Sequence, residues 1–292
     1  MMNRIKRRTL LVGAGAMGVS LAMPAIAQAK KMRFGVGPLL PSAEDTKRAY
    51  TPVFTHLAKE LGVDFELFAT TDWAGMAVGM GSGQLDVAWM GPWGYIIANN
   101  ATNCQAVATV KYDGKPIYYG IVIGKPDMQV SKFPDDTKGR SISFADVGST
   151  SGWLVPSYYA KEVWRIDPRT YWKYSEGATH AANEIAVASG QVDMATDFDR
   201  NRNAMIASGK IKDGDTKVIW TSDPLPNDAI AIAPNAPKDL GAKVQKILTA
   251  ITDEQAKTLL PPRYTGFVDA THASYSTIEK AGVAVGKIKL KS

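Results

Sequence analysis

The sequence predicts an α/β protein of two similar lobes, and an internal repeat is the first of two observations behind this prediction. Residues 83–88 read GQLDVA, and residues 190–195, 107 positions further on, read GQVDMA. Ser42 and Ser149 are the same distance apart, as are Trp73 and His180. One constant offset over several features indicates a duplication rather than a chance match of six residues.

The alternation of strands and helices is the second observation. Three short apolar runs in the first half predict strands, at 32–37, 65–69 and 87–90. Ser42 precedes a helical pattern, has Asp45 three residues on as in a capping box, and the pattern ends at Gly62. The second half repeats this order, with a strand at 141–144 before Ser149. Each lobe is therefore expected to be a mostly parallel sheet flanked by helices.

Later segments predict how the chain passes between the lobes. The β-rich runs 106–112 and 118–123 form one crossover, and a second crossover is expected near 218–232. Helices are also expected at 92–100, 199–207, 242–251 and 253–260, the last with Thr252 as its N-cap. We therefore assign 30–120 plus 225–292 to lobe 1 and 121–224 to lobe 2, with a hinge of two crossovers that can close on a ligand.

The first 29 residues have the pattern of a secretory signal. A basic start is followed by an apolar, small-residue stretch and by small-x-small cleavage sites around Ala27. Arg7 and Arg8 lean toward the twin-arginine route. We expect a protein exported to the periplasm and, with its signal removed, soluble and monomeric.

The signal segment also explains two misleading features. GAGAMG at 13–18 matches a dinucleotide fingerprint, but Pro24 interrupts the helix it needs and the first acidic residue is Glu44. Four of the 34 basic residues and none of the 28 acidic ones lie in 1–29, so the remainder carries a net charge of +2. Neither a nicotinamide-dependent oxidoreductase nor a nucleic-acid-binding protein is indicated.

The loop 146–152, DVGSTSG, is the strongest candidate for chemistry. It lies where a predicted strand leads into a helix, and Gly148 permits a close turn. Ser149, Thr150 and Ser151 place hydroxyls beside amides that have no helical partner, which makes a cradle for an oxyanion from neutral donors. The carboxyl ends of the predicted strands in the two lobes face one another across a cleft. We therefore expect the cleft to bind an anion through hydroxyls and backbone amides, without a buried cation.

The chain resembles a known family over nearly its whole length after the signal: the periplasmic phosphonate, phosphite and hypophosphite binding proteins of ABC importers. The resemblance is carried by TDW at 71–73, DVAWMGP at 86–92, PIYY at 116–119, GSTSG at 148–152, GATH at 177–180 and PND at 226–228. It implies a two-lobed periplasmic binding protein of type II-like fold, with an ABC permease as partner and no cofactor.

The resemblance also implies a pocket. Its oxyanion-gripping loop corresponds to Ser149, Thr150 and Ser151, and its hinge tyrosine corresponds to Tyr118. Three further family positions correspond to Trp73 in the first lobe, His180 in the second lobe and Asp228 late in the pocket.

Two positions depart from the aminoalkylphosphonate binders of this family. Those proteins have a tyrosine where this chain has Trp73, and a glutamate for the ligand's amino group where this chain has Arg200. An arginine would repel an ammonium group, and the larger indole would shrink the pocket. The sequence is therefore more similar to the hypophosphite and phosphite branch, in which Asp228 would accept a hydrogen bond from a protonated ligand oxygen.

Two other functions remain open. An arsenite sensor acting through a two-component system could use Cys104, the single cysteine, although we expect this residue far from the cleft as a small buried side chain. A phosphoester hydrolase could use His180 to activate Ser149 or Ser151, but the sequence shows no third group to orient the histidine. The three histidines are scattered, so no metal site is expected.

Overall fold

The computed structural model describes residues 31–40 and 42–290. The predicted signal, 1–29, lies outside these residues and stays a prediction. None of the helices in the described ranges is both long enough and apolar enough to cross a membrane.

The elements alternate as the sequence predicts. The strands are β1 (Met32–Val36), β2 (Phe65–Ala69), β3 (Val87–Met90), β4 (Gln105–Tyr112), β5 (Ile117–Tyr118), β6 (Gly120–Gly124), β7 (Ser141–Ala145), β8 (Lys173–Ala178), β9 (Met194–Phe198), β10 (Lys217–Thr221), β11 (Leu225–Pro226), β12 (Ala229–Ile232) and β13 (Tyr264–Asp269). The helices are α1 (Ala43–Leu61), α2 (Trp73–Gly81), α3 (Pro92–Thr102), α4 (Val155–Tyr158), α5 (Pro168–Tyr171), α6 (His180–Ala188), α7 (Asp199–Ala207), α8 (Leu240–Thr249), α9 (Asp253–Leu259) and α10 (Ser276–Ala284).

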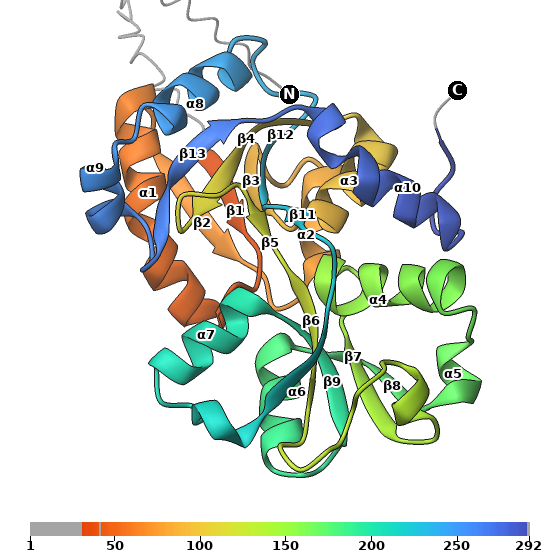
Figure 1. Cartoon of the computed structure of the whole chain (residues 1–292). Coiled ribbons are helices and arrows are strands. Elements are labelled where there is room, and N and C mark those ends of the chain that lie inside the picture. The colour runs from red at the N-terminus through yellow and green to blue at the C-terminus, as the bar shows by residue number, and fades with distance from the viewer. Residues whose placement is uncertain (1–30, 41, 291–292) are drawn as a thin grey trace, which may run out of the picture. The chain divides into compact units, whose positions relative to one another are not determined.

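Two sheets form the cores of two lobes (Figure 1). The six-stranded sheet has the order β13-β4-β12-β3-β1-β2, and the five-stranded sheet has the order β10-β6-β9-β7-β8. Only β2-β1-β3 and β8-β7-β9 run parallel, whereas the outer strands join antiparallel. The sheets are therefore mixed rather than mostly parallel, because a strand that returns from the other lobe enters against the direction of the repeat.

Helices cover the six-stranded sheet on both faces (Figure 1). On one face α1, α8 and α9 bury aromatic and aliphatic side chains such as Phe54 and Val244. On the other face α2, α3 and α10 bury Met76, Trp93 and Ile278. Both sets are hydrophobic toward the sheet, as a layered α/β core requires.

The two lobes repeat the same local devices. The helices α2 and α6 begin 107 residues apart, and each is capped by the preceding side chain, with Asp72 accepting from Gly75 N at 2.6 Å and Thr179 from Ala182 N at 3.1 Å. The predicted caps Ser42 of α1 and Thr252 of α9 are likewise confirmed. The duplication read from the sequence is thus present in the backbone.

The aspartates of the repeated motif brace strands rather than face the cleft. Asp86 accepts from Arg33 N at 2.8 Å where β1 begins. Asp193 accepts from Ser141 N at 2.9 Å where β7 begins, and Lys125 donates to it at 3.0 Å.

The hinge consists of two short strands that pair with each other. β5 and β11 are antiparallel, with Leu225 opposite Tyr118 and Pro226 opposite Ile117. The chain therefore crosses twice between the sheets, once from β4 to β6 and once from β10 to β12. We keep 121–224 as the proposed extent of lobe 2.

The brace at Asp193 predicts a pH-dependent contribution to stability. Desolvation acts to raise the pKa of Asp193, but the hydrogen bonds from Ser141 and Lys125 outweigh it and lower this pKa to about 2. The stabilisation is therefore complete above about pH 4 and is lost as the pH falls toward about 2. Because the carboxyl is partly exposed to solvent, we expect only about 1 kcal/mol.

Asp193→Asn should lower the Tm by about 3 °C at neutral pH, and this difference should shrink in acid. Glu254→Gln, which removes an exposed surface pair with Lys257, serves as the control and should change the Tm little. A constant difference between pH 7 and pH 2, measured by calorimetry, would contradict the assignment.

Candidate functional site

One cavity between the lobes is lined by all eight of the residues that the sequence singled out. These are Trp73, Tyr118, Ser149, Thr150, Ser151, His180, Arg200 and Asp228, and Leu39, Gly91 and Phe198 complete the wall. The cavity has a volume of about 10 Å³, which is close to the minimum that holds one water molecule. The structure thus brings the predicted residues together around a very small space.

The Ser-Thr-Ser loop forms the first turn of a helical run on the lobe 2 side. Ser149 is the N-cap and accepts from Gly152 N at 3.1 Å, and Leu154 N donates to Ser149 O at 3.0 Å in a wide, π-type turn. Ser149, Thr150 and Ser151 are each at most 3% exposed. Their hydroxyls are therefore fixed within the cavity wall rather than free in solvent.

The lobes touch each other around this loop. Thr150 Oγ1 accepts from Trp93 N at 2.8 Å, and Trp93 Nε1 donates to Val147 O at 3.1 Å. A Cβ at Gly148 would lie 2.5 Å from the backbone nitrogen of Ala74, so only glycine permits this approach. The arrangement is that of lobes closed on a site.

Trp73 is seated in space that two glycines provide. A Cβ added at Gly37 would lie 2.2 Å from the indole, and one added at Gly91 would lie 3.2 Å from it. The indole is 6% exposed and lines the cavity. Trp73 thus forms part of the wall of a small cavity, and its effect on pocket size relative to a tyrosine stays a prediction.

A buried charge pair closes the opposite side of the cavity. Arg200 on α7 and Asp228 before β12 come from different lobes, with Nη2 3.5 Å from Oδ1. Asp228 Oδ2 also accepts from Trp89 Nε1 at 3.0 Å. The expectation of an anion site without a buried cation is wrong, because Arg200 is only 4% exposed and lines the cavity.

Aromatic rings surround this arginine. Arg200 Cζ lies 4.6 Å from the centre of the Tyr118 ring and 5.4 Å from that of Phe198. Desolvation acts to lower the pKa of Arg200, yet nearby Tyr264 and Asp228 raise it, so the guanidinium stays charged. Its Nε has no hydrogen-bond partner among the described residues.

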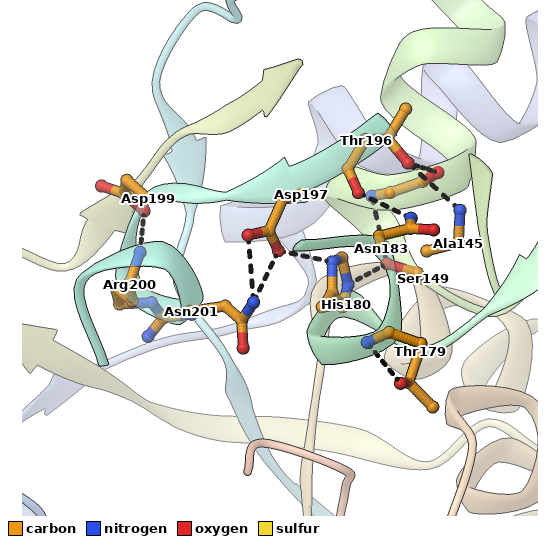
Figure 2. Close-up of polar contacts among 12 residues, drawn as sticks. Ala145, Ser149, Thr179, His180, Asn183, Thr196, Asp197, Asp199, Arg200 and Asn201 are labelled. Carbon is orange, nitrogen blue, oxygen red and sulfur yellow. Dashed lines mark hydrogen bonds and ion pairs between the residues drawn. The ribbon is translucent and has the colours of Figure 1, made fainter. Parts of the chain in front are cut away.

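His180 connects the cavity to a buried carboxylate (Figure 2). Its Nε2 lies 2.9 Å from Ser149 Oγ, and its Nδ1 lies 2.9 Å from Asp197 Oδ1, although that nitrogen makes no well-aligned hydrogen bond. Burial lowers the pKa of His180 to about 4, so the imidazole is neutral at neutral pH. The sequence showed no third group beside the histidine, but in the structure Asp197 lies next to it.

Cys104 is not among the residues that line the cavity. It follows Asn103, the C-cap of α3, and is fully buried. No group of three or more potential metal ligands occurs within 31–40 and 42–290.

Three residues contact or join the predicted site without having been predicted as ligand contacts: Phe198, Asp197 and Trp89. Asp197 and Phe198 are the last two residues of β9, and Trp89 is the last but one residue of β3 in lobe 1. Their position at the carboxyl ends of central strands was a usable signal, because ligands of such sheets bind there.

Fold and site together define a two-lobed binding protein with a small interlobe cavity lined by hydroxyl, charged and aromatic side chains. The family of periplasmic substrate-binding proteins of phosphonate ABC transporters matches residues 38–275. A phosphonates-binding periplasmic protein of Escherichia coli is 34% identical over 207 residues, 70% of this chain and 61% of its own length. The chain belongs to this family.

Two further comparisons show how widely the likeness extends. A phosphate-import protein, PhnD, of Mycolicibacterium smegmatis is 29% identical over 65% of this chain and 62% of its own length. The chain thus spans slightly less than two thirds of either relative. The solved structure of a binding protein component of a phosphonate ABC transporter from Pseudomonas aeruginosa has a TM-score of 0.80 at 24% identity, over 88% of this chain and 87% of its own, which shows the fold.

The contact at Gly148 predicts how closure can be blocked. In Gly148→Ala the new Cβ would meet the backbone of α2, which cannot move aside as a flexible side chain would. We expect the lobes to stay apart and the radius of gyration in small-angle scattering to increase. Gly214→Ala is the matched control, since a Cβ there meets nothing within 4 Å. Equal radii in the two variants would show that the lobes close without this contact.

Proposed function

We propose that this chain is a periplasmic solute-binding protein that captures a small phosphorus oxyanion and delivers it to an ABC transporter. Phosphite, hypophosphite and small phosphonates are the candidates. The convergence of the eight residues on one small interlobe cavity carries the proposal. Family membership supports the transporter as partner and the periplasm as location, with export by the segment 1–29.

The charge balance of the cavity favours a singly charged anion. Arg200 and Asp228 offset one another, so the ligand's charge is stabilised mainly by the hydroxyls and first-turn amides of the loop at Ser149 and by Arg200 Nε. Asp228 would accept a hydrogen bond from a protonated ligand oxygen, whereas it would repel a fully ionised one. Neutral donors also allow the ligand to be released again to a transporter.

Ligand binding should stabilise the protein against heat. A panel of hypophosphite, phosphite, methylphosphonate, phosphate and arsenite can be compared by thermal shift. At about 100 times its dissociation constant, a true ligand contributes about 2.7 kcal/mol, which corresponds to a Tm increase of several degrees. Absence of any shift with the phosphorus oxyanions would overturn the proposal.

Arg200 predicts discrimination against amino groups. Ethylphosphonate and 2-aminoethylphosphonate differ by one ammonium group, and a buried arginine beside the ligand should disfavour the latter. We expect 2-aminoethylphosphonate to bind at least about tenfold more weakly, a difference of about 1.4 kcal/mol in calorimetry. Tighter binding of the amino compound would show that its ammonium does not face Arg200.

Two alternative functions can be tested with the same protein and ligand panel. An arsenite sensor would show an increase in Tm with arsenite alone, and this increase would be lost in Cys104→Ser. The position of Cys104 outside the cavity does not favour this alternative. The array of Ser149, His180 and Asp197 supports a hydrolase by distance alone. However, Ser149 is buried and caps a helix, so we expect no turnover of a chromogenic phosphonate ester.

A further inference from the structure

Two carboxyl groups lie behind the cavity, beyond His180. Asp197 ends β9 and is fully buried, and both of its oxygens accept from Asn201 Nδ2 at 3.0 Å. Glu184 on α6 is also fully buried, and Thr216 donates to its Oε2 at 3.2 Å, while Oε1 meets no donor among the described residues. Neither carboxyl lines the cavity, so the binding of a ligand does not itself require them.

These groups form a line that ends at the ligand-facing hydroxyl. The line runs from Glu184 to Asp197, then to His180 Nδ1, and from His180 Nε2 to Ser149 Oγ (Figure 2 shows it from Asp197 onward). Since Ser149 Oγ already accepts from Gly152 N, its remaining hydrogen-bond capacity depends on the histidine. The heavy-atom distances are compatible with either imidazole tautomer, because hydrogens decide between them.

Resting on the proposed function, we propose that Asp197 acts through His180 as a positioning residue. Its protonation decides whether Ser149 presents a hydrogen or a lone pair to the bound anion.

With Asp197 ionised, His180 carries its proton on Nδ1, and Nε2 accepts the Ser149 hydroxyl hydrogen. Ser149 then turns a lone pair toward the cavity and repels an anionic oxygen. With one proton added to Asp197, the Asp197 O–H donates to Nδ1 and the imidazole proton is on Nε2, which donates to Ser149 Oγ. The Ser149 O–H is then free to donate to the anion. Anion capture in this scheme takes up one proton from solvent.

The surroundings permit this change near neutral pH. Burial raises the pKa of Asp197 to about 7, and burial together with the neighbouring Asp197 carboxylate raises that of Glu184 to about 9. Asn201 donates to both oxygens of Asp197, whereas Glu184 Oε1 meets no donor among the described residues, so we assign the ionising carboxyl to Asp197.

The other charged groups facing this line come from several elements. They are Asp146 after β7, Asp199, Arg200 and Arg202 on α7, with Asn201 and Thr216 as neutral contacts.

The tautomer of His180 can be read directly from its ring ¹⁵N chemical shifts in the unliganded protein. The chain has three histidines, and His180→Gln assigns the signal. We expect the Nε2–H form at about pH 6 and the Nδ1–H form at about pH 8.5. The same tautomer at both pH values would overturn the proposal, whether or not any oxyanion binds.

Binding of hypophosphite gives the second readout, because this anion keeps one charge and has no hydroxyl throughout that pH range. Its affinity should fall by about tenfold or more from pH 6 to pH 8.5. At the higher pH, a plot of the observed binding enthalpy against the ionisation enthalpy of the buffer should have a slope that corresponds to the uptake of about one proton. A pH-independent affinity would overturn the proposal, whereas failure of every oxyanion to bind would overturn the proposed function alone.

Two variants identify the titrating group. In Asp197→Asn the side-chain amide donates to His180 Nδ1 at every pH. We therefore expect the Nε2–H tautomer, and the affinity that the wild type has at pH 6, at both pH values. Glu184→Gln keeps a donor beside Asp197 and should leave the tautomer switch in place. Loss of the switch in Glu184→Gln together with its persistence in Asp197→Asn would overturn the assignment to Asp197. If Asp197→Asn does not fold, the wild-type ¹⁵N shifts still decide.

Discussion

The Arg200–Asp228 contact is the interaction on which the rest of the site depends. Each charge belongs to a different lobe, and each is nearly fully buried when the two meet. A buried charge without a partner is strongly unfavourable, so each can be buried in the closed arrangement only because the other is present. The pair therefore links lobe closure to the electrostatic state of the cavity, and it leaves the net charge of the wall close to zero.

That balance explains why so many neutral donors converge on the same space. Because Asp228 offsets most of the charge of Arg200, selectivity depends on the orientation of the hydroxyl and amide donors. That orientation depends on the residues that hydrogen-bond to these donors from outside the cavity. The carbonyl of Ser149 accepts from Leu154 N, and Ser149 Oγ accepts from Gly152 N and lies 2.9 Å from His180 Nε2. Small changes in a group outside the cavity can thus alter what the ligand meets inside it.

The sequence predicted the backbone better than the side-chain network. The caps Ser42 and Thr252 and the repeat at offset 107 follow from local pattern, so they could be identified without coordinates. Family resemblance supplied the cavity residues. The antiparallel outer strands, the contact of Asp197 with His180 and the pairing of Arg200 across the lobes could not be predicted, because each depends on where distant segments meet.

The seat of Trp73 has an evolutionary consequence. Its indole occupies room left by the missing side chains of Gly37 and Gly91, so the three positions are coupled. Shortening the tryptophan alone would leave a void costing about 24 cal/mol per Å³, and enlarging either glycine first would collide with the ring. A larger residue at Gly37 is therefore accommodated only after position 73 has changed. Such epistasis fixes the order in which this wall of the cavity can evolve.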